Sequence, residues 1–570
     1  MSGRFAACAV LLLLGAVACG GPATVRPDTS FDQASSRVVY PSTARGGTLR
    51  LAVTDAPVSL DPGDAGLAYE ADLARLYARS LVTYAPAPGS AGLRLVPDLA
   101  ETLGRPGDGG RTWTYKLRAG LTYEDGTPVR ARDVKYAVAR SSYTSQLSDG
   151  PRDLREALRG AYWGPYLDPD LDHFTGVTTP DDRTVVFHLK RPDYDFDQLV
   201  ASPQTAPVPQ AKDTRLDYEQ HPLSTGPYRF ERHDIGTGFT LVRNPHWHDD
   251  PNRTALPDRI EVTERVAAAD LDARLGSGRL DADLAGAGVQ PATRTTILGA
   301  PTAKAHADDP LTGLVHYAAL STRVRPFDDV HCRRAVQYAV DRTAVQSAYG
   351  GPTAGAPATN ALPPTVTGYQ AADPYPYDLT RARQELAACH HPNGFSTGIA
   401  VRADRPGDVA AAQALHQALG RIGIDARVTE LSAFQWGSTA GSPGYVHRHG
   451  LGVLIDSWAA NEPTGYAFLR PLTGTVTRVN NLNLMELRDA KVNRYLALGA
   501  RTPDATRRAQ RWADADRAVM QTAAFVPLLA EKTVLYRPAA LANVYVHPAY
   551  GMYDYAALGL RSATRTPASP

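Results

Sequence analysis

The stretch that decides the fold is RTWTYKLRAGLTYEDGTPVRARDVKYAVARS, Arg111 to Ser141. Its first apolar residues alternate with polar ones, at Trp113, Tyr115 and Leu117. This alternation predicts a strand with one buried face. A turn is predicted at Asp125-Gly126, and a helix is predicted from near Arg132. The inward face of that helix is expected to consist of Val134, Ala137 and Val138.

The chain is too long for one ordinary core. At 570 residues it predicts two or more structural units, which allows a cleft between lobes. Its 43% hydrophobic and 21% charged residues are typical of a globular protein. The formal net charge of +1, with acidic and basic residues interspersed, argues against a nucleic-acid partner.

The N-terminus predicts export. Arg4 precedes an uncharged apolar run, Phe5 to Ala18, that is too short for a membrane span and right for a signal peptide. The run ends in AVACGG, which resembles the lipobox of bacterial lipoproteins, whose cysteine is lipidated and becomes the new N-terminus. Cys19 is that cysteine here. Simple cleavage after an Ala-x-Ala site is the alternative. Residues 20–46, rich in Pro, Ser, Thr and Ala, would form a flexible tether.

The second half of the chain alternates helices and strands. Helices are expected at about 330–345, 381–388 and 409–421, and the last one passes into the strand IDARVTEL. This order predicts α/β layers.

Cys332 and Cys389 are the cysteines left in the mature domain, and an even pair in an exported protein permits a disulfide. Two buried thiols are the alternative.

A search for catalytic motifs finds none. The chain has no Gly-x-Ser-x-Gly elbow, no phosphate-binding Gly-rich loop and no His-Glu-x-x-His pair. HWHDD, His246 to Asp250, resembles a metal site, but it follows a strand in a loop flanked by prolines. A surface loop is therefore favoured over a metal site. No catalytic residue, metal or cofactor is predicted.

Several segments occur in the order and spacing of one known family. They are LVPDLAETL (95–103), the stretch quoted above, STGPYRF (224–230), RPFDDVHCRRAVQYAVDRTAV (325–345) and DSWAANEPTGY (456–466). This set resembles the extracellular solute-binding proteins of ABC importers of the peptide and nickel type, family 5. The resemblance extends from about Gly46 to Leu560.

The resemblance implies an α/β fold of the periplasmic-binding-protein type, class II, with two lobes, three subdomains, a hinge and an interlobe cleft. The expected crossings between the lobes lie near Leu311 to Tyr317 and near Ala523 to Val526. The expected division is a signal peptide at 1–19, the tether at 20–46, lobe I at 47–311 with an extra subdomain at about 68–221, lobe II at 312–522, a return to lobe I at 523–560, and a disordered tail at 561–570.

The resemblance also implies a binding site. In peptide-binding members the Trp that ends a strand lines the cleft, and an Asp three residues later pairs with the α-ammonium of the ligand. Here these positions are Trp458 and Asn461. Asn offers only a dipole, so either Glu462 replaces the missing charge or the ligand has no free N-terminus there. Alternatively, Asn461 only turns the loop before Pro463.

The same comparison gives the other ligand-binding candidates, which are Trp436 in FQWGS, Tyr69 and Glu70 before the first helix of lobe I, and Asn480. For the aromatic residues the alternative is core packing, and for Glu70 it is a solvated loop charge.

The function implied is a non-enzymatic, monomeric receptor, anchored by lipid to the outer face of the cell membrane. It would capture a peptide or peptide-like solute and deliver it to an ABC permease. A non-peptide or N-blocked ligand is the alternative within this class. Examples are an oligosaccharide, a metal chelate and a peptide that serves as an extracellular signal. A secreted hydrolase is the alternative from another class.

Overall fold

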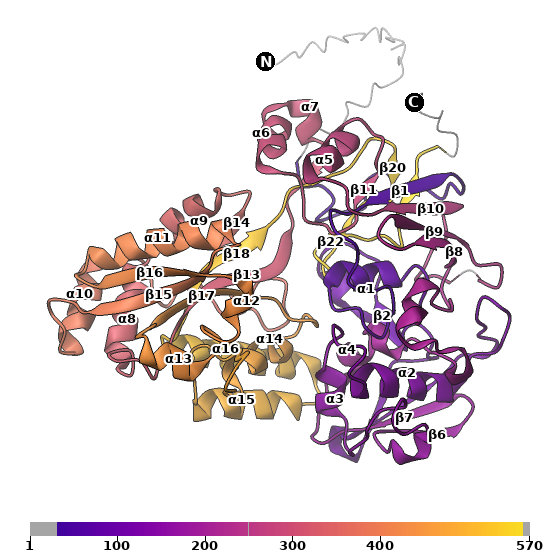
Figure 1. Ribbon diagram of the computed structural model, residues 1–570, viewed down its shortest axis with the longest axis horizontal. Helices are drawn as coiled ribbons and strands as arrows, with labels where there is room; N and C mark the ends of the chain where they lie inside the picture. The colour runs from indigo at the N-terminus through magenta and orange to yellow at the C-terminus, as the bar shows by residue number, and fades with distance from the viewer. Residues whose placement is uncertain (1–30, 249, 563–570) are drawn as a thin grey trace, which may run out of the picture.

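The computed structural model describes residues 31–248 and 250–562. These residues form an α/β protein with two bodies, built around sheets of five, six and four strands (Figure 1). Each of these sheets has a hydrophobic core of its own. Cys19 and the rest of the predicted signal peptide, together with residues 563–570 of the predicted tail, lie outside the described residues.

The five-stranded sheet is the centre of the first body, which we call lobe I. In spatial order its strands are β11 (Ala282–Asp283), β1 (Thr48–Ala52), β10 (Arg259–Thr263), β9 (Gly238–Arg243) and β8 (Tyr228–Asp234). β1 is parallel to both neighbours, whereas β8, β9 and β10 are antiparallel. Lobe I also contains α1 (Ala68–Ala74), β2 (Val82–Tyr84), β3 (Leu95–Pro97), α5 (Ala268–Gly276), α6 (Pro291–Gly299) and α7 (Pro301–Lys304).

The stretch that opens the sequence analysis builds a small subdomain of lobe I. Its antiparallel sheet has the order β4 (Arg105–Gly107), β5 (Thr112–Lys116), β7 (Thr184–His188) and β6 (Val177–Asp181). Its helices include α2 (Ala131–Tyr143), α3 (Asp153–Ala157) and α4 (Phe196–Val200). The predicted strand and helix are confirmed as β5 and α2. Trp113 and Tyr115 are buried, and so are the predicted inward residues of α2 (Val134, Ala137 and Val138).

The six-stranded sheet is the centre of the second body, lobe II. Its strands are β14 (Gly355–Pro357), β18 (Phe525–Lys532), β13 (Leu311–Leu320), β17 (Val453–Trp458), β15 (Ser396–Arg402) and β16 (Asp425–Leu431). Its helices are α8 (Val330–Ala339), α9 (Arg342–Tyr349), α10 (Leu379–Ala388), α11 (Pro406–Gly420), α12 (Ala433–Trp436), α13 (Pro443–Arg448), α14 (Gly465–Thr473), α15 (Ala490–Ala500) and α16 (Ala505–Gln521). In Figure 1, α9 and α11 lie on one side of this sheet and α14 to α16 on the other.

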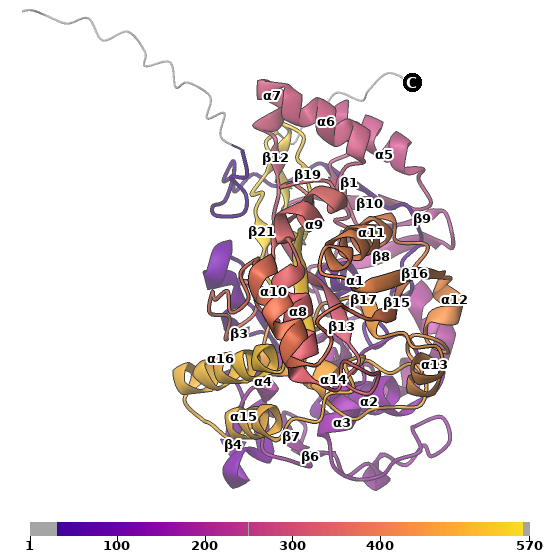
Figure 2. The same cartoon turned by 90° about the vertical axis from the view of Figure 1, so that its left-hand side faces the viewer.

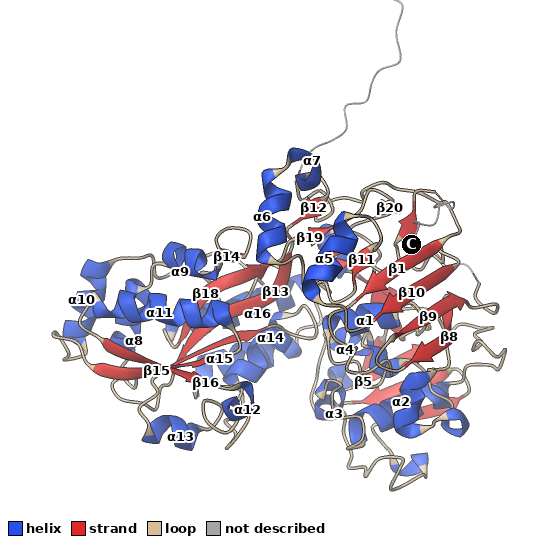
Figure 3. Cartoon of the chain, turned by 45° about the horizontal axis from the view of Figure 1, so that its top comes forward, coloured by secondary structure: helices blue, strands red, loops and turns tan. Residues whose placement is uncertain are grey.

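The chain crosses between the lobes at two neighbouring points. On the lobe I side, β12 (Ala307–Asp308) pairs with β19 (Leu535–Tyr536), and on the lobe II side β13 pairs with β18. Figure 3 shows β12 and β19 where the two bodies meet. The Lys532 ammonium donates to the Asp309 carboxylate at 3.0 Å, and the Thr533 N–H donates to the Pro310 carbonyl at 3.3 Å. Residues 309–310 and 533–534 therefore form a double-stranded hinge.

The second crossing lies further along the chain than expected. The apolar run that begins at residue 523 is the start of β18, which pairs with β13 inside lobe II. The chain therefore returns to lobe I after Lys532, because the whole strand is needed to complete the six-stranded sheet.

Residues 31–46, expected to belong to the tether, pack against lobe I instead. Val39 and Val544 exchange backbone hydrogen bonds of 2.8 and 3.0 Å, and the Ala34 N–H donates to the Asp308 carboxylate at 2.9 Å. The Ala34 and Val39 side chains are buried. Burial of these two apolar residues favours an ordered segment despite its polar composition.

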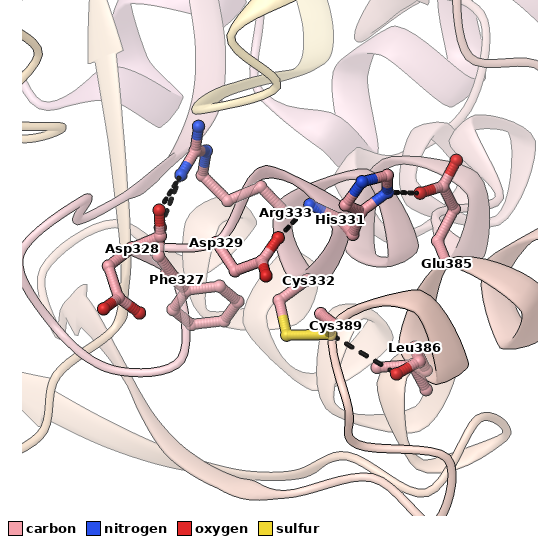
Figure 4. The surroundings of a disulfide bond; sticks show 9 residues. All are labelled: Phe327, Asp328, Asp329, His331, Cys332, Arg333, Glu385, Leu386 and Cys389. Carbon is pink, nitrogen blue, oxygen red and sulfur yellow. Dashed lines mark hydrogen bonds and ion pairs between the residues drawn. A yellow bond between two sulfur atoms is a disulfide. The ribbon is translucent and has the colours of Figure 1, made fainter.

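A disulfide joins two helices of lobe II. Cys332 in α8 and Cys389, which follows α10, are bonded, with their Cα atoms 5.5 Å apart (Figure 4). A hydrogen bond of 2.6 Å between His331 and Glu385 links the same two helices. The predicted disulfide is confirmed, and both cysteines lie in the core of lobe II.

The structure offers no candidate for a transmembrane helix within residues 31–248 and 250–562, since none of their helices has the length and apolar character that a bilayer crossing needs.

Candidate functional site

Trp458 lies at the end of β17, where lobe II faces lobe I. The strand begins with buried apolar residues and ends with half-buried ones. Pairing with β13 places Trp458 opposite Val315. The indole N–H donates to the carbonyl oxygen of Phe468 in α14 at 3.0 Å. The ring is therefore held in one orientation while part of it stays exposed.

A cavity of about 1050 Å³ lies between the two lobes. α3 and residues 191–192 of the small subdomain form one wall, and the segment after β17, α14, α15 and residues 473–488 of lobe II form the other. Four of the predicted ligand-binding residues line it, namely Trp458, Asn461, Glu462 and Asn480. Because both lobes supply walls, a change in the angle between them changes the size of the cavity.

A smaller inner pocket of about 60 Å³ continues from this cavity and shares part of its wall. A single water needs only about 10–15 Å³ of such space, so the pocket has room for a small group. Its lining is rich in carboxylates, which are Asp153, Glu156, Asp193, Asp195 and Glu462. The inner pocket is therefore the most acidic part of the site.

Glu462 is the most enclosed carboxylate of the inner pocket, with 7% of its surface exposed. It follows β17 and precedes α14, in a tight turn where its carbonyl accepts the Thr464 N–H at 2.7 Å. Burial raises the pKa of Glu462 well above its usual value, and the nearby Asp153 and Asp193 raise it further. Burial likewise raises the pKa of Asp193, to about 7, with Asp195 adding to the effect.

Polar contacts join the lobes around the cavity. The Asn461 amide donates to the Asp153 carboxylate at 3.1 Å. Arg470 in α14 pairs with Glu156 in α3 at 3.2 Å. In addition, the Tyr194 N–H of the small subdomain donates to a carbonyl at the end of α15 at 3.0 Å. Figures 1 and 2 both show α15 beside the small subdomain. The position predicted for an ammonium-binding aspartate is therefore an asparagine that contacts the opposite lobe.

Asp195 makes a further contact between the lobes. Its carboxylate accepts hydrogen bonds from the Arg508 guanidinium at 2.5 Å and from the Trp512 indole at 3.1 Å, both in α16. The side chains of Asp195 and Arg508 are only 11% and 13% exposed. The ion pair is therefore shielded from water, and burial raises the pKa of Asp195, although the contacts with Arg508 and Trp512 oppose the shift.

Tyr69 and Glu70 do not line either pocket. Tyr69 packs in the core of lobe I. The Glu70 carboxylate accepts backbone N–H groups of Val58 at 2.7 Å and of Gly66 and Leu67 at 3.0 Å. Burial raises its pKa, and these hydrogen bonds oppose the shift. Here the acid holds the loop before α1 and the first turn of that helix.

Trp436 is also absent from the lining of the cavity. It ends α12, where it packs against the core of lobe II. Asn480 lies near it and is exposed, with a left-handed backbone (φ 49°) and an N–H that donates to the Gly437 carbonyl at 3.0 Å. Asn is among the residues that tolerate this conformation.

The loop that resembles a metal site has a structural role at its end. The Asp250 carboxylate accepts hydrogen bonds from Arg79 at 2.9 Å and Arg118 at 3.0 Å. Arg79 lies between α1 and β2, and Arg118 follows β5. Asp250 therefore ties the loop to two separate segments.

The residues that sequence reasoning missed lie on the small subdomain. Asp153, Asp193 and Asp195 face lobe II because the two lobes approach each other there. The dense run of acids in RPDYDFD, just after β7, is the signal that would have pointed to two of them.

The chain matches the family model "Bacterial extracellular solute-binding proteins, family 5 Middle" over residues 94–479. It is 26% identical over 449 residues to the glutathione-binding protein GsiB of Escherichia coli (strain K12), and this alignment covers 78% of the chain and 82% of that protein.

Among the solved structures that resemble most of this chain are two binding proteins. The clavulanic acid biosynthesis oligopeptide binding protein 2 is 42% identical, with a TM-score of 0.90 over 94% of this chain and 99% of that one. The periplasmic murein tripeptide binding protein MppA, in its unliganded open form, is 19% identical, with a TM-score of 0.74 over 92% and 98% of the two chains. The two-lobed class II fold predicted from the sequence is confirmed by these likenesses.

Proposed function

The chain belongs to family 5 of the bacterial extracellular solute-binding proteins, and we propose that it captures a peptide or peptide-like solute and delivers it to an ABC permease. The observation that carries this proposal is the cavity around Trp458, which takes its walls from both lobes. The relatives support a peptide-type ligand, since one is named for glutathione and another for oligopeptides.

Closure of the lobes on the solute is the proposed mechanism. The double-stranded hinge at 309–310 and 533–534 allows the lobes to rotate, and a solute that contacts both lobes binds the closed state more tightly than the open one. The permease would recognise the closed state, and ATP would be spent by the transporter. This cycle needs no bond to be made or broken by the receptor itself.

An extended peptide suits a cavity of this kind. Its walls carry backbone and side-chain polar groups that would pair with the peptide backbone, and ordered water would accommodate different side chains. Trp458, Asn461, Glu462 and Asn480 are the residues proposed to contact it. Trp458 would supply an apolar surface for stacking.

A ligand without a free N-terminus is the second candidate. Asn461 favours it, because an amide donor replaces the acid that would hold an α-ammonium and is already bonded to Asp153. Blocked peptides, oligosaccharides and metal chelates belong to this class.

Differential scanning fluorimetry tests both candidates. A ligand that binds only the folded protein stabilises it by about 2.7 kcal/mol at 100 times its dissociation constant, so binders raise the melting temperature. A shift with free peptides supports the first proposal, and a shift only with blocked peptides, glycans or chelates supports the second. No shift with any of them would contradict both. Hydrolysis of labelled peptides by the pure protein would instead favour an enzyme.

We also propose that the protein acts as a monomer and is anchored by lipid at Cys19, which precedes the described residues. The apolar run followed by AVACGG supports the anchor. Cys19→Ala should abolish incorporation of a labelled fatty acid and release the protein from the membrane fraction. Unchanged membrane association would favour another mode of attachment.

A further inference from the structure

A second hollow lies on the small subdomain, outside the cavity between the lobes. Its volume is about 820 Å³, within the range of about 300–1,000 Å³ that is usual for small-molecule sites. All of its lining residues lie between positions 143 and 190, in the small subdomain. α3 contributes to both spaces, with Arg155 in the lining of the hollow and Asp153 in that of the cavity. Lobe II supplies none of the walls, so the hollow does not depend on lobe closure.

The hollow presents an apolar surface to solvent. Trp163 and Leu167, in the loop after α3, are 79% and 80% exposed. Tyr143, at the end of α2, and Tyr166 line the same space. A single exposed apolar residue is ordinary on a protein surface, but an exposed group of them beside a concave space is typical of a binding site. The surface suits a flat or extended apolar body.

Positive charge gathers beside this apolar surface. The lining contains three cations, Arg152, Arg155 and Lys190, and one acid, Glu156. Glu156 is paired across the lobes with Arg470 at 3.2 Å. In the part of the chain that the structure describes, no carboxylate forms an ion pair with any of the three cations. The Lys190 ammonium instead donates to the Arg155 carbonyl at 3.0 Å, which holds it at α3. The hollow therefore carries a net positive charge.

Two further donors of the lining lack an acceptor. The Tyr143 hydroxyl and Nη1 of Arg152 are buried, and neither has a hydrogen-bond partner within residues 31–248 and 250–562. Tyr143 is only 8% exposed, and the Arg155 guanidinium lies over its ring at 5.5 Å. The other terminal nitrogen of Arg152 donates to the Leu147 carbonyl at 3.1 Å, which fixes the side chain. A buried donor without an acceptor is costly, so this lining favours a partner that accepts hydrogen bonds.

We infer that the hollow binds an organic anion, a carboxylate attached to an aromatic or alkyl body. The carboxylate would lie beside Arg152 and Arg155, because a guanidinium matches the two oxygens of a carboxylate. The apolar body would cover Trp163 and Leu167. The interlobe cavity is unsuited to the same ligand, since the lining of its inner pocket is rich in carboxylates that repel an anion. This inference does not require that the protein capture a peptide.

Isothermal titration calorimetry with matched probes tests the inference. The probes are naphthoate, its neutral analogue naphthamide, and inorganic phosphate, which has the charge without the apolar body. The wild type is compared with Arg155→Gln and Trp163→Ala, whose side chains are exposed, so both variants should fold. Arg132→Gln is the matched control, because it removes an exposed arginine of α2 that does not line the hollow. Trp458→Ala reports binding in the interlobe cavity.

We expect naphthoate to bind the wild type about tenfold or more tightly than naphthamide, as for other hydrogen bonds to charged groups. Arg155→Gln should reduce this preference about fivefold or more and leave the affinity for naphthamide unchanged. Trp163→Ala should weaken both naphthyl probes about fivefold, because both lose the same ring contact. Arg132→Gln and Trp458→Ala should bind naphthoate as the wild type does.

Three results would overturn the inference. Equal affinity for naphthoate and naphthamide, or no binding of either, would show that the cations do not select an anion. Phosphate binding as tight as that of naphthoate would show that the apolar surface takes no part. A loss of naphthoate binding in Trp458→Ala but not in Trp163→Ala would place the probe between the lobes. Each of these results leaves the proposed capture of a peptide intact, since the fluorimetry with peptides tests that separately.

Discussion

Replacing Asp195 with asparagine should weaken the binding of any solute that requires lobe closure. The Asp195 carboxylate has its side-chain partners, Arg508 and Trp512, on the opposite lobe. A hydrogen bond to a charged group contributes about 1.5–3 kcal/mol, and this contact exists only when the lobes are together. Asparagine keeps an acceptor for the indole but removes the charge. The closed state should therefore lose about 1.5–3 kcal/mol relative to the open one.

This loss corresponds to about a 10- to 150-fold weaker affinity if the ligand-free protein is mostly open, since closure then precedes or accompanies every binding event. Titration calorimetry would give the affinity, and small-angle X-ray scattering would show whether the variant is more extended with bound ligand. Arg508 should remain in place, because it also donates to the Thr502 and Pro503 carbonyls at 2.8 Å.

The matched control is Asp514→Asn in α16, whose acid pairs with Arg511 and Arg517 of the same helix. Its ion pairs do not cross between the lobes, so its affinity should equal that of the wild type. An Asp195→Asn protein that binds ligand within twofold of the wild type would refute the idea that this contact stabilises closure.

Three further predictions concern stability and binding. Removing the disulfide with Cys332→Ser and Cys389→Ser should lower the free energy of unfolding by about 4 kcal/mol, the value expected for a loop of 57 residues, and an unchanged urea midpoint would contradict this. Although burial opposes a charge on His316, its hydrogen bonds to Asp408 and Glu531 raise its pKa to about 9, above the ordinary 6.5. Its stabilising effect should be complete below pH 6.5 and disappear as the pH rises through 9, so urea unfolding of wild type and His316→Asn should converge at high pH. Trp458→Ala should weaken solute binding at least tenfold, whereas Trp458→Phe should retain much of it; equal affinity of all three proteins would remove the indole from the site.

Local patterns predicted much of the fold. The alternation at 113–117 and the helical spacing at 134–138 gave β5 and α2, because one face of each element is buried in a single core. The pairing of Cys332 with Cys389 followed from their being the cysteines left in the exported domain. Trp458 at the end of its strand was placed correctly at a cavity between lobes.

What local patterns did not reveal depends on contacts between distant segments. The acids of the inner pocket come from segments about 300 positions apart, as Asp153 and Glu462 show, and they lie together only because lobe II contacts the small subdomain there. Glu70 was a plausible cleft residue by position, but its carboxylate is occupied by three backbone N–H groups. The boundary of lobe II was misplaced at 523 because an apolar run does not state which sheet it will join.

The packing of residues 31–46 against lobe I has a mechanical consequence. Those residues are bonded to Asp308 and to the segment around Val544, and neither of these belongs to the six-stranded sheet. A force applied at residue 31 is therefore transmitted to lobe I and, through the hydrogen bond from the Asp309 N–H to Asp32, to the lobe I end of the hinge, but not directly to the six-stranded sheet. In a molecule attached to the membrane through its N-terminus, as proposed above, lobe I would stay fixed and lobe II would move relative to it. The orientation of lobe II would then depend on whether a solute is bound.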